Sequence, residues 1–98
     1  MNKTNKMIRT RTKKGFSLTF ANNWTISVQF GYGNYCQNKN HPAGVGLETQ
    51  EGLLESIDAE IAIWDENGTW YNFGGDTVQG YCDTNELADW ISKVSKFD

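Results

Sequence analysis

The feature that most constrains the fold is an alternation of apolar and polar residues over residues 15–30. The stretch reads GFSLTFANNWTISVQF, and its apolar members share one face: Phe16, Leu18, Phe20, Trp24, Ile26, Val28 and Phe30. A period of two residues predicts strands with one buried face. Asparagine tolerates the left-handed backbone conformation of tight turns, so Asn22 and Asn23 predict the turn of a β-hairpin.

A second alternation, SIDAEIAIW, covers residues 56–64 and is followed by the turn-forming residues DENG and by TWYNF. We expect a second hairpin, with Gly68 at a positive φ. The side chains expected to face the core are those of Ile57, Ala59, Ile61 and Ile63. Asp58 and Glu60 alternate with them and would lie on a solvated face. The acidic residues expected to contact a basic protein partner are Asp58, Glu60, Asp65 and Glu66.

The C-terminal residues CDTNELADWISKVSKF predict an amphipathic helix. Asp83 precedes Glu86 by three residues, a spacing typical of a helix N-cap. The apolar residues recur at helical spacing: Leu87, Trp90, Ile91, Val94 and Phe97. The sequence therefore predicts a single α+β domain over residues 15–98. In this domain the helix covers one face of a small four-stranded antiparallel sheet made of two hairpins.

Charge divides the chain into two parts. Six of the nine basic residues lie in residues 1–14, which contain no acid, whereas the remainder carries all twelve acids. Residues 1–14 contain few apolar side chains, so we expect a disordered basic arm, and only this arm would contact nucleic acid. No run approaches the ~18 apolar residues of a membrane span, and no secretory signal is recognisable. A cytoplasmic protein without membrane contact is expected.

The segment FGYGNYCQNKNHPAG, residues 30–44, is the main candidate for a binding site. Its glycines allow close approach, its tyrosines offer ring faces and its asparagines offer donors and acceptors, which suits a nucleobase or a sugar. A second glycine-rich segment, residues 71–82, would supply backbone amides to an anion or a ribose if it lay at the same end of the sheet. Ordinary turns explain the same residues as an alternative. The expected ligand-binding residues are Tyr32, Gly33, Asn34, Tyr35, Asn38, His41, Trp70, Asp76, Thr77 and Tyr81.

Catalytic and metal sites lack the necessary residues at useful spacing. Cys36 and His41 lie five residues apart with no identifiable third group to orient them. A structural zinc site needs four ligands, and only these two residues and Cys82 are of the Cys or His type. We therefore expect no enzyme activity, no cofactor and no metal. Both cysteines are expected to remain thiols in a reducing cytosol.

The stretches GFSLTFANNWTISVQFGYGNYC and AEIAIWDENGTWYNFGGDTVQGYCDTNELADWI together resemble a group of short accessory proteins encoded in tailed-phage genomes. The resemblance covers roughly residues 15–95. It implies a small phage protein that counters a host defence in the host cytoplasm, by sequestering a nucleotide-derived ligand. The alternatives are an acidic inhibitor that blocks a host defence protein, and a domain with a purely structural role. A free sheet edge also makes a homo-oligomer an expectation.

Overall fold

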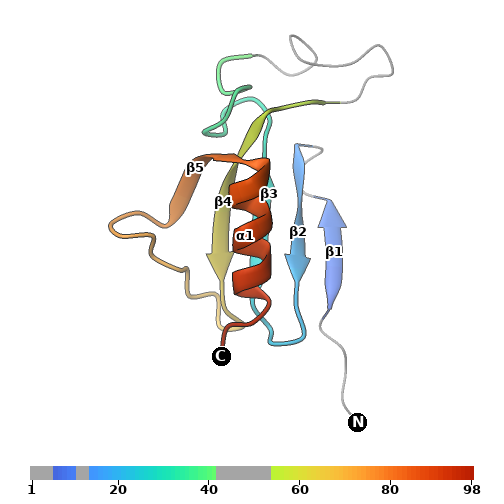
Figure 1. The fold of residues 1–98 in the computed structure, drawn as a ribbon, viewed down its shortest axis with the longest axis vertical. Helices are drawn as coiled ribbons and strands as arrows, with labels where there is room; N and C mark the ends of the chain where they lie inside the picture. Colours follow the sequence, from blue (N-terminus) through green and yellow to red (C-terminus); the bar gives the residue numbers. More distant parts are fainter. Residues whose placement is uncertain (1–5, 11–13, 42–53) are drawn as a thin grey trace.

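The computed structural model describes residues 6–10, 14–41 and 54–98 (Figure 1). The fold is α+β, with one five-stranded antiparallel sheet and a C-terminal helix. The elements are β1 (Met7–Thr10), β2 (Gly15–Thr19), β3 (Thr25–Gln29), β4 (Asp58–Trp64), β5 (Val78–Asp83) and α1 (Thr84–Val94). The strands lie in the sheet in chain order, so each one pairs with the next. None of the described helical residues forms a helix long and apolar enough to cross a membrane.

The sheet has one strand more than the four that the sequence predicts. Strand β1 lies inside the arm for which disorder was expected, and it pairs with β2 from Met7 opposite Thr19 to Thr10 opposite Phe16. The expectation of disorder is therefore wrong for residues 7–10. Backbone hydrogen bonds along the edge of β2 order these residues although their four side chains are exposed. The rest of the arm up to residue 13, apart from Lys6, lies outside the described residues.

The hairpin partner of β4 also differs from the expectation. Of the TWYNF segment, Trp70 makes an isolated bridge to Trp64, and Tyr71 donates its N–H to the carbonyl of Ile63 at 2.7 Å. This single bridge does not extend into a ladder, and the regular partner of β4 is β5. The expectation of a strand at residues 69–73 is wrong because β5 occupies most of the edge of β4 that those residues would need.

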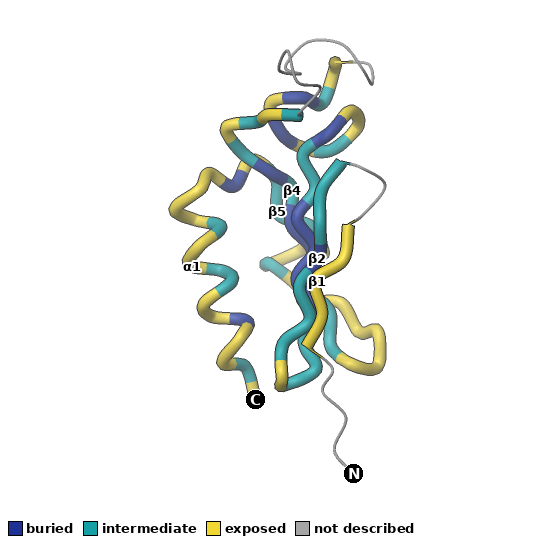
Figure 2. Tube along the Cα trace, turned by 90° about the vertical axis from the view of Figure 1, so that its right-hand side faces the viewer, coloured by how far each residue is buried: buried dark blue, intermediate teal, exposed yellow. Residues whose placement is uncertain are grey.

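The core lies between α1 and one face of the sheet (Figure 2). Its buried residues are Ile26, Val28, Ala59, Ile61, Ile63, Cys82 and Val94. The first hairpin and its turn are confirmed, with Asn23 at φ 70°, and Gly68 has the expected positive φ of 80°. Ile57 is 68% exposed, contrary to the expectation that it faces the core. It precedes the first residue of β4, so the alternation of the strand does not extend to it.

Helix α1 begins where the sequence predicts. The side chain of Asp83 accepts the N–H of Glu86 at 2.8 Å and so caps the first turn. At the other end Asn22 donates to the carbonyls of Val94 and Phe97 at 2.8 and 3.0 Å, which ties the helix to the β2–β3 turn. The helix packs on β3, β4 and β5, and β1 and β2 lie to one side of it (Figure 1).

Candidate functional site

The loop of residues 31–41 is attached to the sheet through two carboxylates of β4. The N–H of Tyr35 donates to Glu60 at 3.2 Å, and the N–H of Gln37 donates to Asp58 at 2.7 Å. The Asn34 side chain adds a longer bond of 3.4 Å to Glu60. Because Asp58 and Glu60 alternate with core residues, these bonds attach the loop to the sheet face that α1 does not cover. Two of the four acidic residues expected to contact a partner thus shape the loop of their own chain.

A buried asparagine holds the same loop from inside. Asn38 is 1% exposed, and its Nδ2 donates to the carbonyls of Phe30 at 2.7 Å and Glu55 at 2.9 Å. Its Oδ1 is buried and accepts no hydrogen bond from the described residues. Asn38 is one of the residues predicted to bind a ligand, but its side chain does not reach the surface. Its two hydrogen bonds join Phe30, just before the loop, to Glu55, which lies three residues before β4.

Three tyrosines lie on the outside of this loop and of the adjoining part of β5. Tyr32, Tyr35 and Tyr81 are 51%, 46% and 55% exposed, and we call them the tyrosine surface. The N–H of Tyr81 donates to the carbonyl of Tyr35 at 2.9 Å, which joins strand and loop. The Nζ of Lys39 lies 5.5 Å from the ring centre of Tyr35, and the Nζ of Lys14 donates to the carbonyl of Tyr32 at 2.7 Å. Two cations therefore adjoin the tyrosines.

Tyr81 occupies an irregular position in β5. At the register shift between β4 and β5, Glu60 lies opposite two residues, Gly80 and Tyr81, which makes a β-bulge. Tyr81 has φ 54°, a left-handed conformation that is unfavourable for a tyrosine. Gly80 is needed because a Cβ there would lie 2.6 Å from the Cβ of Tyr35. The bulge therefore brings β5 into direct contact with the loop.

Two other loop residues predicted to bind a ligand, Gly33 and Asn34, stabilise the conformation of the loop. Gly33 has φ 87°, and its N–H donates to the carbonyl of Lys39 at 3.0 Å. The Asn34 Oδ1 accepts the N–H of Gly31 at 3.0 Å, which closes the first turn. His41 is exposed at the end of the described part of the loop.

In the second glycine-rich segment, the turn at Gly74 and Gly75 is closed by a side chain of the same segment. The amides of Gly74 and Gly75 both donate to the Oδ1 of Asn72, at 2.7 and 2.6 Å, so an acceptor from the chain already occupies the amides expected to hold an anion. Asp76 and Thr77 follow on the exposed surface of the same turn.

Trp70 lies at the opposite end of β4. It stacks on Trp64 with ring centres 5.4 Å apart, beside the turn that contains Asp65 and Glu66. The Asp65 carboxylate accepts the N–H groups of the next turn residues, Asn67 at 2.9 Å and Thr69 at 3.0 Å. The predicted aromatic pocket and the predicted acidic surface are therefore each divided between the two ends of β4.

Both cysteines are free and buried. Burial is the largest cause of the raised pKa of each thiol, and the pKa of Cys82 reaches about 11. Thiols with raised pKa values are poor nucleophiles at neutral pH because the thiolate is the reactive form. Among the described residues, no group of three or more His, Cys, Asp or Glu side chains is arranged to hold a metal ion.

The raised pKa of Cys82 predicts a loss of stability at alkaline pH. Burial, then the carboxylates of Glu86 and Asp83, raise this pKa from 9.0 to about 11. Between these values the unfolded chain loses the thiol proton while the folded chain keeps it, so the free energy of unfolding falls as pH rises. Urea denaturation at several pH values is expected to show a smaller alkaline slope for Cys82→Ala than for wild type. Equal slopes would contradict the assignment.

Sequence reasoning named all three residues of the tyrosine surface but neither Lys14 nor Lys39. The sequence carried one signal for the bulge, Gly80, because a glycine inside a strand often marks a bulge. The roles of Asp58 and Glu60 had no such signal, since their bonding partners lie more than twenty residues away. Comparisons of the chain with known protein families, with curated proteins and with solved structures found no match.

Proposed function

We propose that this protein is a binding module that docks on a partner protein through the tyrosine surface. The observation that carries the proposal is the exposure of about half of Tyr32 and Tyr35 on an irregular loop whose backbone is held by hydrogen bonds to β4 and β5. Tyrosine is enriched among residues that contribute most to protein interfaces, because it supplies a large, rigid contact area. A loop that is already ordered loses little conformational entropy on binding.

The exposure of the tyrosine rings suits a protein as the partner of this surface, because exposed aromatic side chains on an ordered loop can fill pockets on a partner. The resemblance to phage accessory proteins suggests a host defence protein as the partner. The contact then runs through the tyrosines, while Asp58 and Glu60 act indirectly by holding the loop.

A second candidate function follows from the two lysines beside the tyrosines. The Nζ of Lys39 lies over the ring of Tyr35. Lys39 is therefore a local cation in a part of the chain, outside residues 1–14, where acids outnumber bases twelve to three. An aromatic face next to a cation suits a nucleobase and its phosphate. In this version the protein sequesters a nucleotide-derived ligand on the same surface.

The test of the first candidate compares a double variant, Tyr32→Ser with Tyr35→Ser, against Trp70→Ser. Trp70 is a matched control because it is 48% exposed but lies at the other end of β4. Proteins captured from a lysate of a phage-susceptible bacterium are quantified, and the affinity of a recurrent partner is then measured after purification. The double variant is expected to bind that partner at least about tenfold more weakly, since hot-spot tyrosines contribute ~2 kcal/mol or more. Binding unchanged in a folded double variant would refute the proposal.

The second candidate is tested by thermal denaturation with a panel of mono-, di- and cyclic nucleotides. A ligand at 100 times its dissociation constant adds ~2.7 kcal/mol to stability. A selective increase that is lost in Lys39→Glu and in Tyr35→Ser, but kept in Trp70→Ser, would favour nucleotide sequestration over a protein partner. Unchanged denaturation curves across the panel would remove this candidate.

A further inference from the structure

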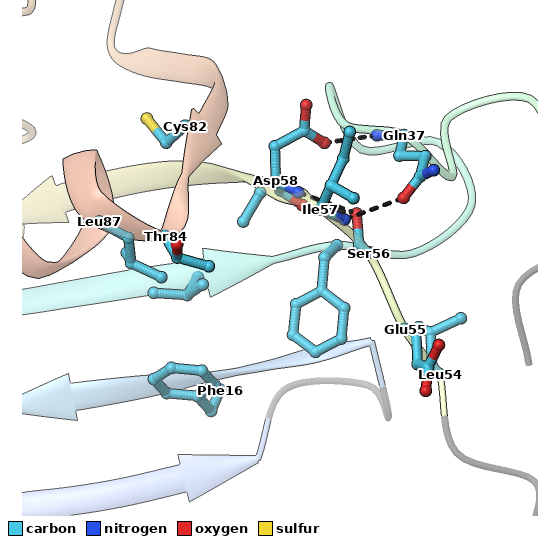
Figure 3. A pocket seen from close by; sticks show the side chains of 13 residues that line it. Phe16, Gln37, Leu54, Glu55, Ser56, Ile57, Asp58, Cys82, Thr84 and Leu87 are labelled. Atoms are coloured by element: carbon cyan, nitrogen blue, oxygen red, sulfur yellow. Dashed lines mark hydrogen bonds between the residues drawn. The ribbon is translucent and has the colours of Figure 1, made fainter. Parts of the chain in front are cut away.

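A separate cavity of about 570 Å³ opens on the sheet face that carries α1, near the first turn of the helix (Figure 3). Its apolar walls include Phe16, Val28, Phe30, Ala59, Cys82 and Leu87. The volume falls within the range of roughly 300–1,000 Å³ that is typical of sites for small molecules. No residue of the tyrosine surface lines it, so it is distinct from the surface proposed to bind a protein.

Small side chains and the position of the helix leave this space open. Ala59 and Cys82 are cross-strand partners at the floor of the cavity, and neither reaches far from the sheet. Helix α1 packs on β3, β4 and β5, so Phe16 of β2 lies to one side of it. Leu87 forms the helical wall. Because ligand sites are typically open, mostly apolar cavities of this size, the cavity is a candidate binding site.

The polar lining residues of the cavity are Gln37, Glu55, Ser56, Asp58 and Thr84, and the two charged ones are both acidic. Glu55 and Asp58 both line it, and the described lining residues include no Lys, Arg or His. Asp58 is held in place because it accepts the N–H of Gln37 at 2.7 Å, and the Ser56 hydroxyl donates to the Asp58 carbonyl at 2.6 Å (Figure 3). The Asp58 carboxylate is turned toward the loop, on the other face of β4, but its charge still acts at the cavity, because it contributes, after burial, to the raised pKa of Cys82 at the floor.

We propose that this cavity binds a small molecule with an apolar body and a cationic end. The apolar walls favour a hydrocarbon or aromatic body, since its burial removes apolar surface from water. The carboxylates of Glu55 and Asp58 attract a cation such as an amine and repel a carboxylate or a phosphate. The charge at the rim thus selects the end of the ligand, and the volume limits its size.

The test uses decylamine and decanoate, which share an alkyl chain and differ in charge. In methyl-labelled full-length protein, decylamine is expected to shift the NMR signals of Val28, Ala59 and Leu87. The signals of Ile63 and Val94, which do not line the cavity, are expected to stay in place. Decanoate is expected to bind at least about tenfold more weakly. Equal affinity for the two compounds, no binding of either, or shifts confined to other methyl groups would overturn the proposal.

A cavity-filling variant provides the second measurement. Ala59→Leu adds side-chain atoms to the floor of the cavity and is expected to weaken decylamine binding at least tenfold. Ala88→Leu, on the exposed side of α1, makes the same change outside the cavity and is expected to bind as wild type does. If Ala59→Leu does not fold, Leu87→Phe fills the cavity from the helix instead. Undiminished binding in a folded cavity-filling variant would refute the site, and so would an equal loss in Ala88→Leu.

Discussion

Replacing Asn38 by alanine is expected to lower the free energy of unfolding by about 2–4 kcal/mol. The substitution removes the donor for the carbonyls of Phe30 and Glu55 and leaves both oxygens without that hydrogen bond inside the loop. Each buried polar group that loses its partner costs ~1–3 kcal/mol. Urea denaturation measures the change, and an unchanged m-value would show that the variant still unfolds as a single cooperative unit.

The matched control is Asn40→Ala, which changes the same residue type in the same loop. Asn40 is exposed, so its replacement is expected to change stability by less than about 0.5 kcal/mol. A loss below about 1 kcal/mol for Asn38→Ala would mean that the loop does not depend on the buried amide. The proposed binding function adds a second readout, because a loosened loop would also weaken contact through Tyr32 and Tyr35.

Replacing Ile61 by alanine is expected to destabilise the domain by about 2–5 kcal/mol. Ile61 is fully buried in the middle of β4, between the paired strands β3 and β5 and beneath the helix. The loss has two parts, the hydrophobic burial of the deleted carbons and the cavity that remains in a close-packed core. The measurement is again the free energy of unfolding in urea.

Ile57→Ala is the control for this second prediction. Ile57 is 68% exposed, so the same deletion is expected to cost less than about 0.5 kcal/mol. This pair also separates the observed fold from the pattern in the sequence, which assigns both isoleucines to the core face. Similar losses at the two positions would contradict the burial of β4 described above.

Elements with a strong local pattern could be predicted from the sequence. The alternation in residues 15–30 yields β2 and β3 with their turn, and Asp83 marks the start of α1 through its bond to Glu86. These predictions succeed because hydrophobic periodicity and capping depend on residues only a few positions apart. The alternation in β4 was also recognisable, although Ile57 does not share the burial of the residues that follow it.

Elements whose stability depends on distant partners could not be predicted in this way. Strand β1 has only exposed side chains and forms because the edge of β2 offers backbone hydrogen bonds. Strand β5 carries a glycine and a bulge that hide its alternation, while the more regular TWYNF segment makes only an isolated bridge. The pairing thus depends on which strand edges are available, and a residue pattern does not contain that information.

The sequence by itself determined that the chain forms an α+β domain and that residues 31–41 concentrate tyrosine, glycine and asparagine. Only the tertiary structure decided that Asn38 turns inward, that Asp58 and Glu60 accept hydrogen bonds from the loop, and that the Tyr81 N–H donates to the Tyr35 carbonyl. The physical reason is that composition sets which groups an irregular loop offers. The hydrogen bonds that direct those groups inward or outward come from strands far away in the chain.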